Sequence, residues 1–333
     1  MYKFVLATLL FTSTLQSSAQ TVDELRETAR SFQRQGDVDN AILILNKAIA
    51  MEPSNVDLSK DLALTLIAAQ QYNKANDILK PLVNKADADE QVFQLSAMVN
   101  IAQGNDKEAD RIYKLALKKF PNNGMLNYEY GNLLDAKEPG AGKGVKLWET
   151  GVELDPLYPG NYFKLAKYHS NAGNYLWTIL YGETFVNLES FTARTTEIKH
   201  LLLDGYKKMF VLDLVEKNGK SDFENSILKN LKRQKNVTGL GISAESLTAL
   251  RARFILDWEE ASESKFNCDI FNLHKSLLQK GLFEAYNQWL FGSVENLAAY
   301  QLWTNSNATL FKEFNDYQRN NVFRVTQKQF MIK

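Results

Sequence analysis

The sequence contains a single cysteine and three histidines among its 333 residues. Because Cys268 is alone, the chain cannot form an internal disulfide or carry a lipid-attached cysteine after an export signal. His169, His200 and His274 are far apart, and none has the two-histidine helical spacing of a zinc site. We therefore predict no metal site and no cofactor.

The chain also lacks an excess of charge of either sign. Lysine plus arginine equals aspartate plus glutamate at 39 each, so no global field favours nucleic acid or an acidic membrane. No segment alternates apolar and polar residues as a half-buried strand would. With 45% apolar residues, the composition is that of a globular protein. We predict an all-α protein without a nucleic-acid partner.

The apolar run near the N-terminus has the residue order of a secretory signal. Lys3 provides a cationic start, Phe4–Phe11 is almost wholly apolar, and Ser17–Ala19 offers small residues for cleavage before Gln20. A membrane anchor would need about twenty apolar residues, and the run is too short for that. We predict a signal peptide over residues 1–19 and a mature chain without a transmembrane span. Export without disulfides fits a periplasmic or secreted bacterial protein.

Small residues recur along the first half of the chain at a fixed spacing. Ala41, Ala75 and Ala109 stand 34 residues apart, and Gly36 and Gly104 lie five residues before the first and the third. A fixed period of this length indicates stacked copies of one supersecondary unit. Within each period, two segments have apolar residues at three- and four-residue steps and are separated by a break. This predicts a helix–turn–helix unit.

The pattern resembles the tetratricopeptide repeat (TPR) family, which has small residues on the first helix, a glycine-like turn, and small and aromatic residues on the second. The nearest match, Glu90 to Asn123, has Ala97, Gly104, Ala109, Tyr113, Ala116 and Pro121 at the family's positions. The other repeats are expected at Val22–Asn55, Val56–Asp89, Gly124–Tyr158 and Pro159–Ala193, with a capping helix over Arg194–Val211. The resemblance implies a solenoid of helical hairpins over residues 20–211, a scaffold that hosts many functions.

After Val211 the period fades, although the helical pattern continues. Helices are expected at about Phe223–Gln234, Ala244–Glu260, Ile270–Gln279, Leu282–Phe291, Ala298–Trp303 and Leu310–Asn320. We predict a further α-helical region over residues 212–333. Helical pairs continuous with the solenoid are favoured over a separate all-α domain, because no strand pattern interrupts them.

Residues suited to catalysis are few. Cys268 and His169 are interpreted as core residues, because neither has a catalytic partner nearby in the sequence. The glycine-rich segment Gly140–Gly144 lacks the Ser or Thr that follows the lysine of a phosphate loop, and no strand precedes it. It is interpreted as the turn within the fourth repeat. We predict that the protein is not an enzyme.

The alternative function lies in the C-terminal helices, where aromatic residues concentrate. These residues are Tyr286, Trp289, Phe291, Tyr300 and Trp303. Aromatics at helical spacing are usually core, but tryptophan and tyrosine also form partner anchors or sugar-stacking platforms. The alternative is therefore a carbohydrate-handling or catalytic protein with its site in these helices and the repeats as an adaptor.

The family resemblance also implies a binding surface, because the first helices of TPR repeats line a concave face. Among the positions that map to this face, those expected to bind are Arg26, Arg30, Lys60, Leu64, Met98, Tyr128, Asn132 and Lys167. The three cations at the N-terminal end would form a basic entrance, and Leu64, Met98 and Tyr128 an apolar floor. We predict an exported interaction module that binds a protein or peptide segment with acidic and apolar residues, as part of an envelope or secreted assembly.

Overall fold

The computed structural model describes residues 20–239, 241–260 and 266–327, so the predicted signal peptide lies outside the described residues. Over these ranges the secondary structure is helical and contains no strand. The predicted all-α fold is thereby confirmed. The chain forms two compact units, of which the first ends at Ile112 and the second begins at Tyr113.

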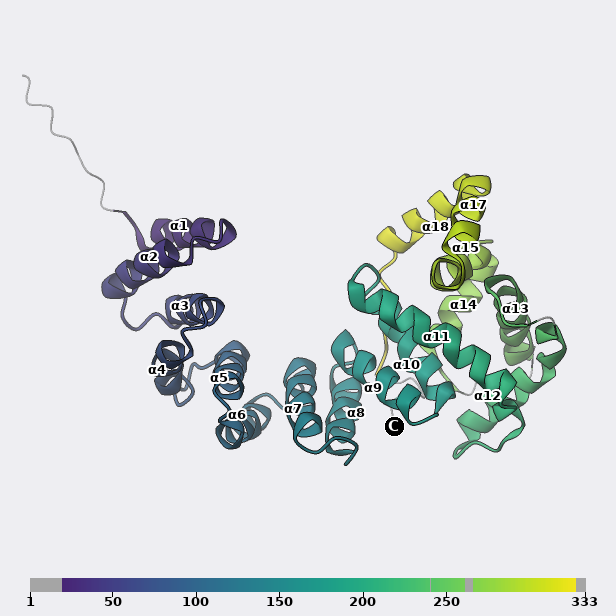
Figure 1. Cartoon of the computed structure of the whole chain (residues 1–333), viewed down its shortest axis with the longest axis horizontal. Helices are drawn as coiled ribbons and strands as arrows, with labels where there is room; N and C mark the ends of the chain where they lie inside the picture. The colour runs from purple at the N-terminus through teal and green to yellow at the C-terminus, as the bar shows by residue number, and fades with distance from the viewer. Residues whose placement is uncertain (1–19, 240, 261–265, 328–333) are drawn as a thin grey trace, which may run out of the picture. The chain divides into compact units, whose positions relative to one another are not determined.

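The first unit consists of helical hairpins (Figure 1). Its helices are α1 (Val22–Arg34), α2 (Val38–Met51), α3 (Val56–Ala68), α4 (Tyr72–Leu82), α5 (Glu90–Ala102) and the first half of α6 (Asp106–Lys119). The first helices of the pairs begin at Val22, Val56 and Glu90, and the second helices at Val38, Tyr72 and Asp106, in steps of 34. The structure therefore has the repeat boundaries that the sequence predicts.

A side-chain cap explains where the first helices of the first four hairpins begin. Thr21, Asn55 and Asp89 directly precede α1, α3 and α5, and each accepts a hydrogen bond from the backbone N–H three residues later. Asn123 does the same for α7 (Gly124–Lys137). Each cap satisfies a backbone donor at the helix start, which stabilises the helix by about 1 kcal/mol. The caps recur with the 34-residue period and so position the helices locally.

The small residues of the period lie where the paired helices pack against each other. Ala41, Ala75 and Ala109 are each 0% exposed, as predicted for positions at helix crossings. Larger side chains there would force the helix axes apart. The packing of α1 on α2 and of α3 on α4 thus depends on the same residues that reveal the period.

The second unit contains two more hairpins and the C-terminal helices. The hairpins are α7 with α8 (Lys143–Leu154) and α9 (Pro159–Asn171) with α10 (Tyr175–Leu188), followed by α11 (Ala193–Val211). The remaining elements are η1 (Leu214–Glu216), α12 (Asp222–Arg233), η2 (Lys235–Thr238), α13 (Ala244–Glu260), α14 (Asp269–Gln279), α15 (Phe283–Asn287), the π-helical turn η4 (Gln288–Gly292), α16 (Ser293–Glu295), α17 (Leu297–Ser306) and α18 (Ala308–Asn320). Gly140–Gly142 lie in the turn between α7 and α8, with Gly140 and Gly142 at φ of 79° and 73°, whereas Lys143 and Gly144 begin α8. The interpretation as a turn is confirmed for the first three residues of the segment.

One hydrophobic core runs through the second unit. It includes buried residues from Val145 on α8 to Val325 beyond α18. Helix α10 is buried on nearly all sides and packs on α9, α11 and α14. The C-terminal helices therefore share a core with the fourth and fifth hairpins, and this core extends across residues 211 and 212.

Candidate functional site

The predicted basic residues of the first unit are neutralised by neighbouring carboxylates. Arg26 Nε lies 2.6 Å from Asp61 Oδ2, which joins α1 to α3, and Arg30 Nη1 lies 2.7 Å from Glu27 Oε1. The hydrogen bond to Asp61 raises the pKa of Arg26 above its ordinary value despite partial burial. Both guanidinium groups are therefore committed to pairs within the repeats.

Lys60 is paired twice. Its Nζ lies 2.8 Å from Asp57 Oδ1 and also contacts Asp89 Oδ2, while Asp89 Oδ1 caps α5. Burial disfavours the charged amine, but the two carboxylates outweigh this and raise the pKa of Lys60. With Glu27, Asp57, Asp61 and Asp89 beside the three cations, this surface has no net positive charge. It does not form the basic entrance that the sequence suggested.

The apolar positions of the same surface are open to solvent. Leu64 on α3 and Met98 on α5 are 44% and 37% exposed, and they stand one 34-residue period apart on helices that pack together. Ile101 is exposed one helical turn beyond Met98. We call Leu64, Met98 and Ile101 the α3–α5 strip. Large apolar side chains repeated at equivalent positions of adjacent repeats make a continuous contact surface.

The remaining predicted residues lie on the first helices of the second unit. The ring of Tyr128 is half-buried, with its centroid 5.7 Å from that of Tyr158. Lys167 Nζ lies 2.5 Å from Glu197 Oε1 and 5.1 Å from the ring centroid of Phe163.

Asn132, the last residue of this group, is half-buried on α7. Its amide oxygen is buried and accepts no hydrogen bond from the described residues. A buried acceptor of this kind carries a desolvation cost. Within the second unit the predicted surface therefore combines a paired cation, a half-buried aromatic ring and one unsatisfied amide.

The aromatic cluster of the C-terminal helices is largely core. Tyr286, Trp289 and Phe291 are buried, and Trp289 stacks on Tyr286 with ring centroids 5.8 Å apart. Trp303 is half-buried and donates a hydrogen bond from its indole nitrogen to Glu284. The two tryptophans thus do not form the exposed pair that a sugar-stacking platform requires.

A buried polar cluster lies in the core of the second unit. Glu183 on α10 binds Arg251 on α13, and its Oε1 lies 2.7 Å from His274 Nε2 on α14 and 2.7 Å from the Tyr286 hydroxyl. Asn287 on α15 accepts a hydrogen bond from Arg251. All five side chains are almost inaccessible to solvent. The cluster ties four helices together around one carboxylate.

The pKa shifts in this cluster follow from its charges. Burial opposes ionisation of Glu183, but Arg251 and the hydrogen bonds from His274 and Tyr286 outweigh it and lower the pKa of Glu183 to about 2. Burial lowers the pKa of His274 against the attraction of Glu183. The state near pH 7 is a Glu183–Arg251 ion pair with a neutral imidazole beside it. A closed ion pair without solvent access is suited to holding helices rather than to catalysis.

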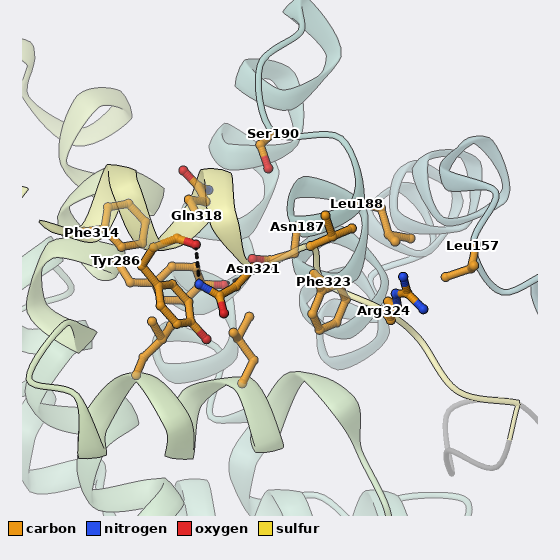
Figure 2. Close-up of a pocket in the computed structure, with 14 residues that line it drawn as sticks. Leu157, Asn187, Leu188, Ser190, Tyr286, Phe314, Gln318, Asn321, Phe323 and Arg324 are labelled. Atoms are coloured by element: carbon orange, nitrogen blue, oxygen red, sulfur yellow. Dashed lines mark hydrogen bonds between the residues drawn. The ribbon is translucent and has the colours of Figure 1, made fainter. Parts of the chain in front are cut away.

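A cavity of about 510 Å³ lies next to this cluster, between the end of α10, helices α14, α15 and α18, and the segment after α18. Figure 2 shows Tyr286, Phe314 and Gln318 at one end of the cavity and Leu157, Leu188 and Arg324 at the other. Tyr286 connects it to the cluster: its hydroxyl donates to Glu183 and accepts from Asn187. The volume is within the usual range for small-molecule sites.

Neither the cluster nor the cavity is among the features predicted from the sequence, although the sequence contains a signal for the cluster. Glu183 is the one charged residue of α10, amid Ile179, Leu180, Phe185 and Val186. Arg251 falls within the apolar stripe of α13 between Leu247 and Phe254. A charge in an apolar stripe indicates a buried, paired group. The cavity had no such signal, because its lining residues come from distant segments.

The described ranges contain no group of three or more His, Cys, Asp or Glu side chains placed to hold a metal ion. Nor, within the same ranges, is any helix both long and apolar enough to cross a membrane. Cys268, like His274, is buried, and burial raises the pKa of its thiol to about 12.

Two tetratricopeptide repeat models match the sequence, one over residues 33–99 and the other over residues 91–123. These matches cover part of the first repeat and all of the second and third. The chain therefore contains TPR repeats. No curated protein matches it.

Solved TPR structures are similar to the chain at low sequence identity. A thermophilic TPR protein of Thermus thermophilus is 15% identical, with 55% of this chain and 100% of that chain covered at a TM-score of 0.46. A TPR protein of Parabacteroides merdae is 17% identical, with 78% and 98% covered at a TM-score of 0.44. YrrB, described as a TPR protein with an unusual peptide-binding site, is 13% identical, with 58% and 99% covered at a TM-score of 0.38.

Proposed function

We propose that this protein is a non-catalytic module that binds a protein or peptide segment on the face formed by the first helices of its TPR repeats. The observation that carries the proposal is the α3–α5 strip, where Leu64 and Met98 expose large apolar side chains one period apart. Exposed apolar side chains in register mark a contact surface, since a solvated helix face has no need of them.

The ion pairs beside the strip favour an apolar partner over an acidic one. Arg26, Arg30 and Lys60 are already bound to carboxylates, so an acidic segment would gain little net attraction from them. Apolar contact supplies the affinity, and the surrounding charges of both signs favour a particular orientation of the partner. The partner segment is therefore apolar on the side that meets α3 and α5.

Peptide selection followed by affinity measurement tests this proposal. Random peptides are selected on the wild-type protein, and their Kd values are measured by fluorescence anisotropy. Leu64→Glu and Met98→Glu should each weaken binding about tenfold or more, because a charge replaces an apolar contact. Leu43→Glu is the matched control, since Leu43 is likewise an exposed leucine but lies on the second helix α2. It should leave Kd within about twofold.

Two outcomes would contradict the proposal. Equal losses in Leu43→Glu and Leu64→Glu would mean that binding is unspecific. Unchanged binding in both strip variants, with a loss in Tyr128→Ala alone, would show that the α3–α5 strip does not carry the binding and would move it to α7. Circular dichroism of each variant separates lost binding from lost folding.

We also propose that residues 1–19 direct export to the periplasm or the exterior of a bacterial cell. The support is the order of cationic, apolar and small residues from Lys3 to Ala19. The intact mass of protein recovered from the envelope or the medium tests it, and a chain that starts at or near Gln20 is expected. A retained Met1 in the cytosolic fraction would contradict export without affecting the binding proposal.

A further inference from the structure

The cavity of the second unit has apolar walls that remain open to solvent at its mouth. Its apolar lining residues are Leu157, Leu188, Leu273, Leu277, Phe314 and Phe323. Leu157 and Val322, which also line it, are 51% and 77% exposed. Apolar surface is therefore continuous from the solvent into the cavity, as a site for an apolar ligand requires.

The charge on the described lining of the cavity is positive. Arg324 lines it, is exposed, and forms no ion pair with any described residue. Among the residues that the structure describes, no aspartate, glutamate or lysine lines the cavity. The nearby Glu183 lies behind Tyr286 and is neutralised by Arg251. An anion entering the mouth would meet an unpaired guanidinium and no opposing carboxylate from the described ranges.

Two polar side chains of the lining have unused hydrogen-bonding capacity. Asn187 donates to the Tyr286 hydroxyl and to a carbonyl of its own helix, which leaves its side-chain oxygen without a donor from the described residues. The Tyr317 hydroxyl likewise has no hydrogen-bond partner within the part of the chain that the structure describes. These groups are uncharged, so they orient a ligand without changing the preference for an anion.

We propose that this cavity binds a small molecule that has an apolar body and a single carboxylate, as a medium-chain fatty acid has. The body occupies the space between Leu188, Leu277 and Phe314, and the carboxylate lies at the mouth against Arg324. The site is separate from the α3–α5 strip and gives the protein a second ligand, independent of its peptide partner.

Isothermal titration calorimetry with three ligands of one chain length tests the proposal. Decanoate and decylammonium are titrated into the full chain below their micelle concentrations, and decanol below its solubility limit. We expect decanoate to bind at one site per chain, decanol about tenfold more weakly, and decylammonium not measurably, because only the anion complements Arg324. Arg324→Gln should weaken decanoate about tenfold and leave decanol unchanged.

Two further variants test whether the ligands bind in this cavity and not elsewhere on the protein. Arg319→Gln removes an exposed arginine of α18 that does not line the cavity, and it should leave decanoate affinity unchanged. Ser190→Trp places an indole at the lining and should abolish binding of both decanoate and decanol. Equal decanoate affinity in Arg324→Gln and wild type, or a preference for decylammonium, would overturn the proposal.

A second copy of the chain is the competing occupant. If none of the three ligands binds, and the wild type self-associates in analytical ultracentrifugation while Ser190→Trp does not, the cavity receives a partner chain and the proposal is wrong. Failure of all three ligands without self-association also overturns it. Neither result bears on the peptide-binding variants of the first unit.

Discussion

Lys199 Nζ lies 2.7 Å from the carbonyl oxygen of Trp289 and 3.7 Å from the centroid of a ring of its indole. That carbonyl belongs to the π-helical turn η4, where the regular helical hydrogen-bonding pattern is interrupted. The Lys199 side chain joins α11 to the C-terminal helices, as does the packing of Tyr206 on Phe291. Burial lowers the pKa of Lys199 to about 7.

This burial predicts a stability that rises with pH. The unfolded lysine has a pKa of 10.5 and the folded one a pKa of about 7, so between these values the unfolded state binds more protons and stability increases with pH. Relative to Lys199→Met, which cannot titrate, the wild type should gain about 1.4 kcal/mol for each pH unit across this window. Urea unfolding at several pH values measures this difference.

Lys199→Arg is the matched control for this effect. Its guanidinium stays protonated throughout the window, so its stability relative to Lys199→Met should not change with pH. A wild-type difference that is equally independent of pH would show that Lys199 is not buried as the structure places it.

Because Glu183 and Arg251 form a buried ion pair, mutations of the two residues should have strongly non-additive effects on the free energy of unfolding. Arg251→Met should destabilise the protein by about 3–5 kcal/mol, because it leaves a buried carboxylate without its cation. Adding Glu183→Leu should recover part of this loss, since the unpaired charge is then removed. Urea unfolding of both single variants and the double variant completes the cycle. A double variant whose loss equals the sum of the single losses would contradict the coupling.

A larger side chain at the buried alanine of the third repeat should reduce the stability of that repeat and its neighbours. Ala109 is 0% exposed, so Ala109→Leu should destabilise the protein by about 1–3 kcal/mol. Because repeats contact mainly their neighbours, hydrogen exchange should increase around residues 90–123 and not around residues 266–327. Ala298→Leu, at an exposed site on α17, should change stability by less than about 0.5 kcal/mol. Unchanged exchange around residues 90–123 would mean that the repeat assignment is wrong.

The turn of the second repeat predicts a stabilising substitution. Gln70 has φ of 57° where Gly36 and Gly104 occupy the equivalent turns at 75° and 74°. A left-handed conformation costs a residue with a Cβ about 1 kcal/mol, so Gln70→Gly should raise the free energy of unfolding by about that amount. Gln70→Ala retains the Cβ and should not stabilise. If both variants stabilise equally, strain at this position is not the cause.

The repeats could be predicted from the sequence because their determinants are local. The caps Thr21, Asn55 and Asp89 and the alanines of the helix crossings act within one repeat or between adjacent ones, so a period of 34 is enough to place the helices. Side-chain direction on the first helices follows from the same period. The sequence was therefore sufficient to predict that Leu64 and Met98 are exposed on a common surface.

The charges on that surface were harder to interpret. The sequence contains Asp57, Asp61 and Asp89 as plainly as it contains Arg26 and Lys60. Which carboxylate meets which cation depends on how consecutive repeats are packed, since Arg26 on α1 reaches Asp61 on α3 and Lys60 reaches the cap of α5. The basic patch was predicted from one helix at a time. In the structure the same residues form a neutral network of ion pairs.

By itself the sequence determined the helical class, the repeat length, the helix starts and the small residues at the crossings, because each of these is encoded within about 34 consecutive residues. Only the tertiary structure decided the cluster around Glu183 and the cavity beside it. Glu183 meets Arg251, His274 and Tyr286 from 68 to 103 residues away. No period links those segments, because their contacts are set by the packing of one shared core and not by a repeated local pattern.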